Sequence, residues 1–205
     1  MKNILTALLM KNILTALLIS TIFVGCAAKT AGGGGAPEKP KNTGNAKIDK
    51  FVSDAFAVYD EVQDMKKNLA ELNTTLNDIN NHPVGPIEWI KEDIAKSLSK
   101  AKNSQLDPQA LKEALNGKIS GMIGNVKATL KGVETIQANI KLLLKTLPEL
   151  PAEASSLGFK APKALNSIKA TGGMIKALPG ELVSLAKEAE AVVKNCQTLL
   201  SSIGN

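Results

Sequence analysis

The sequence contains no arginine and very few aromatic residues. All 25 basic residues are lysines, and Phe, Trp and Tyr together account for 3% of the 205 residues. Arginine supplies the planar fork that grips phosphates and base edges, and aromatic rings supply the surfaces on which bases stack. A formal net charge of +6 without either residue type argues against a nucleic-acid-binding protein.

Side chains suited to catalysis or metal binding are also scarce. The chain has one His, two Cys and one Tyr, which leaves few candidates for a nucleophile, a general base or a metal ligand. His82 stands alone in the loop sequence NHPVGP. Cys196 falls on the apolar side of an expected helix, where a free thiol behaves as a small hydrophobe. We therefore expect no enzyme activity, no cofactor and no metal site.

The N-terminus begins with a tandem repeat, because residues 1–9, MKNILTALL, recur unchanged as residues 10–18. Read from Met10, a cationic Lys11 precedes an apolar run and a small residue, which is the order of parts in a secretory signal peptide. Residues 1–25 are therefore predicted to be a signal peptide. Either Met10 is the working start, or the first copy is a duplication that the export machinery tolerates.

The segment Phe23-Val24-Gly25-Cys26 resembles the lipobox of bacterial lipoproteins, with Phe in place of the usual Leu. The resemblance implies that Cys26 is diacylated, that the peptide before it is removed, and that the new N-terminus is usually acylated as well in Gram-negative bacteria. Ala27 stands where an Asp would imply retention in the inner membrane, so the resemblance implies the outer membrane. The alternative is an ordinary signal peptide in which the cysteine stands by chance.

Residues 26–45 contain the lipidated cysteine and a predicted flexible tether. After Cys26 the sequence AAKTAGGGGAPEKPKNTGN is rich in Gly, Pro and Lys and has no large apolar residue. Such a segment buries too little surface to fold by itself. We expect it to separate the membrane anchor from a folded domain.

Residues 46–205 have helical periodicity and no alternating strand pattern. Apolar residues recur at seven-residue steps in two long segments, 46–80 and 108–147, as expected for heptad-patterned helices. The heptad positions of the first segment are Ile48, Phe51, Ala55, Val58, Val62, Met65, Leu69, Leu72, Leu76 and Ile79. Those of the second are Leu115, Ile119, Met122, Val126, Val133, Ile136, Ile140, Leu143 and Leu147.

Prolines and caps divide the remaining sequence. Asp107-Pro108 supplies an N-cap acceptor and a first-turn proline, and further helices are predicted over 87–101, 162–178 and 180–203. The last of these has an apolar seam at Leu182, Leu185, Ala189, Val192, Cys196, Leu199 and Ile203. The predicted fold class is all-α, an elongated antiparallel helical bundle that occupies residues 46–205.

Small residues share one side of the second long helix, at Gly117, Gly121, Gly124 and Ala128. Each interior Gly costs about 1 kcal/mol of helix propensity relative to Ala, so we expect a compensating role. One candidate is the close approach of a neighbouring helix in the bundle. The other is a shallow groove for an acyl chain or a partner helix.

Charge is segregated along the helical region. Residues 48–93 carry ten acids and four lysines, whereas residues 94–205 carry fifteen lysines and eight acids. We expect the acidic first helix to lie against the basic later helices, so that charge fixes their pairing.

Between residues 154 and 180 the lysines meet no acid. The lysines of this segment are Lys160, Lys163, Lys169 and Lys176, and its apolar residues include Leu165, Ile168, Ile175 and Leu178. The pattern favours an amphipathic helix that lies on an anionic membrane or contacts an acidic partner.

Together these features predict an exported, lipid-anchored helical bundle of the bacterial cell envelope, at the outer membrane. The leading hypothesis is a non-catalytic scaffold or adaptor whose long helices bind another envelope protein. The alternative is a lipid-binding or apolar-ligand-binding protein, or a membrane-active helical protein. The expected partners are the membrane, through the acyl chains on Cys26, and an envelope protein, while nucleic acid is not expected. The oligomeric state is not predicted.

Overall fold

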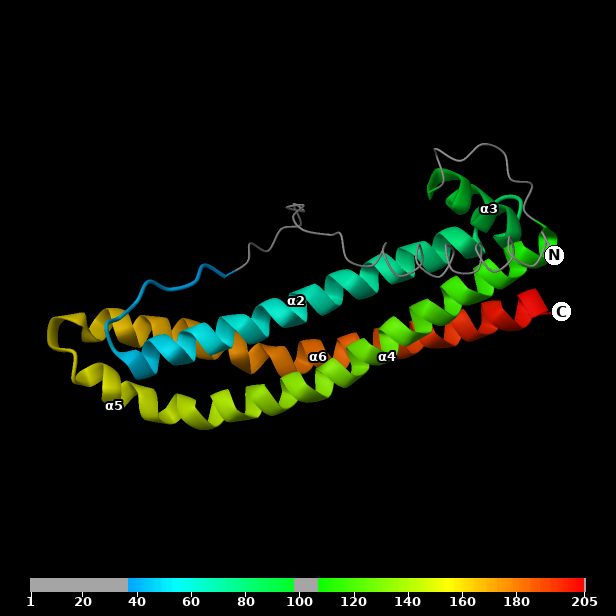
Figure 1. Ribbon diagram of the computed structural model, residues 1–205. Helices are drawn as coiled ribbons and strands as arrows, with labels where there is room; N and C mark the ends of the chain where they lie inside the picture. Colours follow the sequence, from blue (N-terminus) through cyan, green and yellow to red (C-terminus); the bar gives the residue numbers. More distant parts are fainter. Residues whose placement is uncertain (1–36, 98–106, 205) are drawn as a thin grey trace, which may run out of the picture.

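The computed structural model describes residues 37–97 and 107–204. The predicted signal peptide, Cys26 and the tether as far as residue 36 lie outside these ranges. Every regular element of the described residues is helical, and no strand is present among them. The predicted all-α helical bundle is therefore confirmed (Figure 1).

Three long helices form most of the structure. They are α2 (Ala46–Asn80), α4 (Pro108–Thr146) and α6 (Ala161–Gly204), with 35, 39 and 44 residues. At 1.5 Å per residue each is about 50 to 65 Å long. The first two begin and end within a residue or two of the predicted positions, because a cap or a proline marks each boundary.

Short elements connect the long helices. α3 (Pro86–Ser97) follows α2, and its predicted extension to residue 101 lies outside the described residues. Between α4 and α6 the chain passes through η1 (Leu147–Glu149), α5 (Leu150–Ser155) and η2 (Gly158–Lys160). This proline-rich stretch forms short helical turns, as the breaks in the sequence pattern predict.

The chain turns back between α2 and α4 and again between α4 and α6 (Figure 1). The start of α2 lies beside η1 and α5, where Lys47 forms ion pairs with Glu149 of η1 and Glu153 of α5. The start of α4 lies beside α3, where Lys118 pairs with Asp93. We call the first region, with the starts of α2 and α6, the entry end, and the second, with α3 and the end of α6, the far end.

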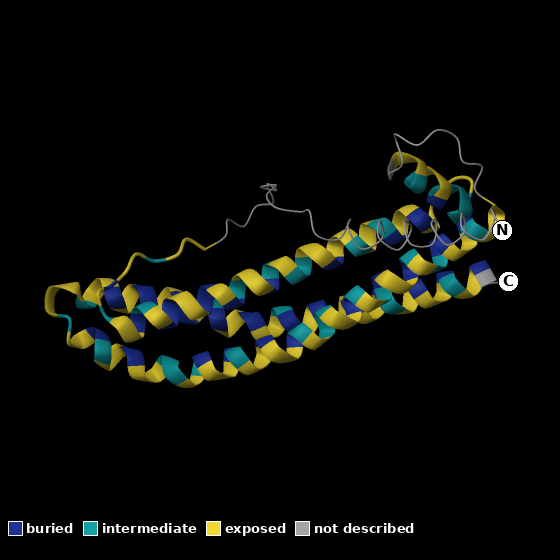
Figure 2. Cartoon of the chain, viewed as in Figure 1, coloured by how far each residue is buried: buried dark blue, intermediate teal, exposed yellow. Residues whose placement is uncertain are grey.

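One apolar core runs between the three long helices (Figure 2). Eight of the ten predicted heptad positions of α2 are buried, and the other two, Met65 and Leu72, are partly buried. All eight heptad positions on α4 are buried, and the ninth, Leu147, lies in η1 and is partly buried. All seven seam positions of α6 are buried. Each fully buried Leu or Ile contributes about 1.5 to 3 kcal/mol of hydrophobic stabilisation, so these stripes hold the bundle together.

The predicted division of the last segment into two helices is wrong, because α6 continues through Pro179. The prediction rested on the missing N–H of proline, which costs about 3 kcal/mol inside a helix. In the structure Ile175, Leu178 and Leu182, on both sides of the proline, are fully buried. A break would remove part of this stripe from the core, and burial of three such side chains outweighs the cost of one proline.

Ion pairs between helices only partly follow the predicted charge segregation. Lys118 of the basic half pairs with Asp93 of the acidic half, but Asp93 lies on α3 and not on the acidic first helix. The pair of Lys66 with Glu181 has the reverse arrangement, with the lysine on the acidic α2 and the glutamate on the basic α6. Exposed pairs contribute at most about 1 kcal/mol each. Helix pairing is therefore set by the buried stripes rather than by the net charge of each half.

Candidate functional site

The N-terminal segment joins the bundle through Asp49. One carboxylate oxygen of Asp49 accepts hydrogen bonds from the Thr43 N–H at 2.7 Å and the Thr43 hydroxyl at 2.8 Å, and the other accepts one from the Gly44 N–H at 3.2 Å. Burial acts to raise the pKa of Asp49, but these hydrogen bonds outweigh it and hold the pKa below its usual value. The last residues of the predicted tether, from Thr43 onward, are therefore fixed to the folded domain.

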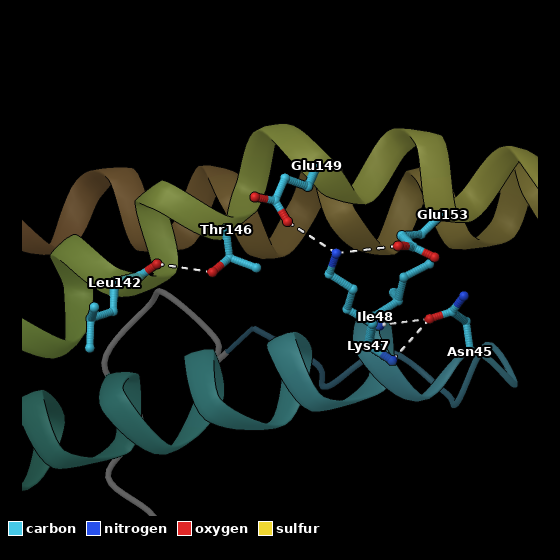
Figure 3. A network of polar contacts seen from close by, with 7 residues as sticks. All are labelled: Asn45, Lys47, Ile48, Leu142, Thr146, Glu149 and Glu153. Atoms are coloured by element: carbon cyan, nitrogen blue, oxygen red, sulfur yellow. Dashed lines mark hydrogen bonds and ion pairs between the residues drawn. The ribbon is translucent and has the colours of Figure 1, made fainter.

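Lys47 fastens the start of α2 to the region after α4. Its Nζ lies 3.0 Å from Glu149 Oε2 and 3.2 Å from Glu153 Oε1, and Figure 3 shows it between the two carboxylates. Hydrogen bonding to Glu149 and Glu153 raises the pKa of Lys47 above its usual value. In Figure 3 the side chain of Asn45 also caps α2 by accepting hydrogen bonds from the N–H groups of Lys47 and Ile48. The two glutamates are the last acids before α6 in the sequence, and both are engaged.

The four lysines of the acid-free segment are exposed, as their pattern predicts. They are Lys160, Lys163, Lys169 and Lys176. None of them forms an ion pair within the described residues. The apolar side of the segment faces inward, because Ile168, Ile175 and Leu178 are buried in the core. The segment is amphipathic, but its apolar side packs inside the bundle and only Leu165 of this set is partly exposed, at 39%.

Phe159 is a candidate that the sequence reasoning missed. It lies in η2, directly before Lys160, and its side chain is fully exposed. Phe51 and Phe56, by contrast, are buried. Lys160 Nζ lies 3.7 Å from the position that a Cβ would take on Gly44, which places this turn at the entry end beside the N-terminal segment. The available signal was an aromatic residue outside every heptad, next to a lysine and far from any acid.

The small residues of α4 face solvent. Gly117, Gly121, Gly124 and Ala128 are all exposed, and a Cβ on Gly121 or Gly124 would meet no atom within 4 Å. Close approach of a neighbouring helix, the first of the two predicted roles, is therefore wrong within the described residues. Contact with an acyl chain or a partner helix from outside the chain stays a prediction.

Close approach occurs at two other glycines. Gly172 on α6 is buried, and a Cβ there would lie 2.9 Å from Leu147 Cδ1 and 3.0 Å from Leu147 Cδ2. On α4, a Cβ on Gly132 would collide with the terminal methyl group of Met65. These glycines let neighbouring side chains pack against the helix backbone.

The far end has a polar recess of about 270 Å³. On its wall, Lys118 Nζ lies 2.5 Å from Asp93 Oδ2 and 4.8 Å from the ring centroid of Trp89. The recess is lined by Thr75, Asp78, Trp89, Glu92, Asp93, Lys96 and Lys118. This mixture of charged side chains does not suit an apolar ligand.

The scarce reactive side chains are separated from one another. Cys196 is fully buried, and burial raises the pKa of its thiol, which disfavours the nucleophilic thiolate. His82 Nε2 lies 3.6 Å from Glu92 Oε1. Within residues 37–97 and 107–204, no group of three or more His, Cys, Asp or Glu side chains could hold a metal ion. No helix in this part of the chain combines the length and apolarity needed to cross a membrane.

Comparison with models of protein families, with curated proteins and with solved structures finds no match to this chain. Function is therefore inferred from the residues and from their positions in the fold.

Proposed function

We propose that the chain is a lipid-anchored, non-catalytic scaffold of the bacterial cell envelope, which holds a partner protein along its long helices. The observation that carries the proposal is that each of α2, α4 and α6 has one buried side and one exposed side. Their apolar stripes are buried in one core, while their outer sides extend over about 50 Å or more without covering one another. A rod of this kind offers a long surface on which a partner protein can bind.

Anchoring through Cys26 is supported by the lipobox resemblance and by the way in which the N-terminal segment meets the bundle. The hydrogen bonds of Thr43 and Gly44 to Asp49 attach this segment at one end of the rod. A bundle held at one end presents its sides to neighbouring proteins. Ala27 after the lipidated cysteine favours the outer membrane as the site of anchoring.

A role in binding lipids or other apolar ligands has less support. The apolar residues of the lysine segment, such as Ile168 and Ile175, are buried within the bundle. The recess at the far end is lined mainly by charged side chains. The recess therefore does not suit an apolar ligand. To reach the apolar residues of the lysine segment, such a ligand would have to separate the helices of the bundle.

Photo-crosslinking in the native cell tests the scaffold. A photoreactive amino acid is placed at one exposed position on each long helix, at Glu61 of α2, Gly121 of α4 and Asn195 of α6. We expect one adduct of defined mass, concentrated on one helix, which identifies the partner and the side that it binds. The position on α4 also tests whether the exposed glycines contact the partner.

Two controls make the result decisive. In the variant Cys26→Ser the chain loses its acylation site, so the adduct should disappear with the membrane location. Mass spectrometry of the N-terminal peptide reports the acyl chains on Cys26 directly. The proposal fails if none of the three helices yields an adduct and the acylated protein behaves as a monomer.

A further inference from the structure

The entry end combines one exposed aromatic side chain with two lysines that form no ion pair in the part of the chain that the structure describes. Phe159 is fully exposed, and the exposed Lys160 and Lys163 lie one and four residues after it. Isolated exposed apolar residues are normal on protein surfaces, and Val84 and Val183 are examples in this chain. Phe159 differs because it is aromatic, lies at a turn at the end of the rod, and is followed by two lysines.

The charged residues that follow Phe159 directly in the chain are lysines. Glu149 and Glu153 share one cation, Lys47, and Asp49 accepts hydrogen bonds from the N–H groups and the hydroxyl of residues 43 and 44. Lys160 and Lys163 form no ion pair within residues 37–97 and 107–204. An aromatic ring beside free lysines is the combination that binds the headgroup region of an anionic bilayer.

We propose that Phe159, Lys160 and Lys163 form a membrane-contact tip, which inserts its phenyl ring among anionic lipids and sets how the rod stands on the membrane. The inference rests on the proposed anchoring through Cys26. Lys160 reaches the N-terminal segment at Gly44, and the stretch from Cys26 to Gly44 can span at most about 65 Å. The anchor therefore keeps the tip within about 65 Å of the bilayer, and this confinement raises the effective concentration of the tip at the membrane, so even weak insertion is effective.

The lysines act by electrostatic attraction and the ring by burial of apolar surface. Each lysine near an anionic surface strengthens binding about 5-fold, so the pair contributes about 25-fold. A neutral bilayer lacks the attraction but still accepts the ring. The tip should therefore distinguish anionic from neutral lipid.

Fluorescence of the full acylated chain in vesicles tests the tip. The variant Phe159→Trp, combined with Trp89→Phe to remove the native indole, is reconstituted in phosphatidylcholine mixed with an equal amount of phosphatidylglycerol. We expect a blue-shifted indole that is quenched by lipids brominated in their acyl chains. Circular dichroism checks each variant for native helicity, and a second version that retains Trp89 reads the same change as a difference spectrum.

Matched variants separate the tip from the anchor. Val84→Trp, also combined with Trp89→Phe, places an indole at an exposed position at the far end, where we expect no quenching. Lys160→Gln with Lys163→Gln should reduce the insertion equilibrium about 25-fold. Lys187→Gln with Lys194→Gln makes the same change in charge at exposed positions farther along α6 and should have little effect.

Several outcomes would contradict the proposal of a membrane-contact tip. If the indole at position 159 is not quenched on vesicles that carry the acylated chain, the proposed membrane contact is wrong, while the proposed anchored scaffold is unaffected. A blue shift that appears without lipid and grows with protein concentration assigns the ring to contact with a second copy. Equal quenching in neutral and anionic vesicles would show that Lys160 and Lys163 do not contribute to membrane contact. Failure of the scaffold would instead appear as missing adducts in cells.

Discussion

Two glycines of α4 and one glycine of α6 have opposite surroundings. Gly121 and Gly124 on α4 are exposed, and a Cβ on either would meet nothing within 4 Å. Gly172 on α6 is buried, and the methyl groups of Leu147 occupy the space beside it. Glycine thus allows close packing at position 172, whereas at positions 121 and 124 it lowers helix propensity with no packing contact in return. Whether a glycine is packed depends on the side chains that neighbouring helices place beside it, and not on its spacing along its own helix.

The largest effect is expected where the glycine is packed. Gly172→Val adds atoms at a position where Leu147 Cδ1 and Cδ2 already lie 2.9 and 3.0 Å from the Cβ site. The free energy of unfolding should fall by about 2 to 3 kcal/mol, measured by urea denaturation with circular dichroism. The double variant with Leu147→Ala should recover part of this loss. Without any recovery, the contact with Leu147 is not the cause.

A smaller effect of opposite sign is expected at the proline inside α6. Pro179→Ala restores a backbone donor for the Ile175 carbonyl and should raise the free energy of unfolding by about 2 kcal/mol. Pro162→Ala is the matched control, because a proline in the first turn of α6 breaks no intrahelical hydrogen bond. An equal gain from both substitutions would show that the chain loses nothing by continuing the helix through Pro179.

Substitution of each open glycine by alanine should raise the free energy of unfolding by about 1 kcal/mol. Gly121→Ala and Gly124→Ala improve helix propensity without a clash, so the free energy of unfolding should rise for each. Gly173→Ala is the control, because Gly173 lies on α6 but is also exposed and open. A gain at Gly173 similar to that at Gly121 shows that surroundings matter and the choice of helix does not. A decrease in the free energy of unfolding for Gly121→Ala or Gly124→Ala would contradict the exposure of these two positions.

The smallest effect is expected at Gly132. A Cβ there meets only the end of the flexible Met65 side chain, which can move aside. The cost of displacing that methyl group should offset the gain in helix propensity, so Gly132→Ala should change the free energy of unfolding by less than about 0.5 kcal/mol. A loss as large as that for Gly172→Val would mean that Met65 cannot change its rotamer.

The heptads of α2 and α4 could be predicted because aliphatic spacing alone decides which side of a helix is buried. Ile48, Leu76 and Ile136 would enter a core whichever helix packed against them. The continuity of α6 could not be predicted in the same way. Pro179 is a local signal with a known cost, whereas the burial of Leu178 and Leu182 depends on helices more distant in the sequence.

The candidate surfaces show the same limit. Exposure of Lys160 and its neighbours followed from their charge, but the inward side of their helix depended on what packs against it. The glycines of α4 shared one side as predicted, yet only coordinates could show that nothing in the described chain covers that side. Phe159 was visible as an aromatic residue off the heptads, but its full exposure depends on the turn at η2.

The junction at Asp49 also has a mechanical meaning. A pull on the N-terminal segment is carried at Thr43 by the hydrogen bonds to Asp49, which pass it into the first turn of α2. Lys47 then shares that load with α5 through Glu149 and Glu153. Because the C-terminus lies at the other end of the rod (Figure 1), a pull on the N-terminal segment acts on one end of the bundle and tends to turn it as a whole.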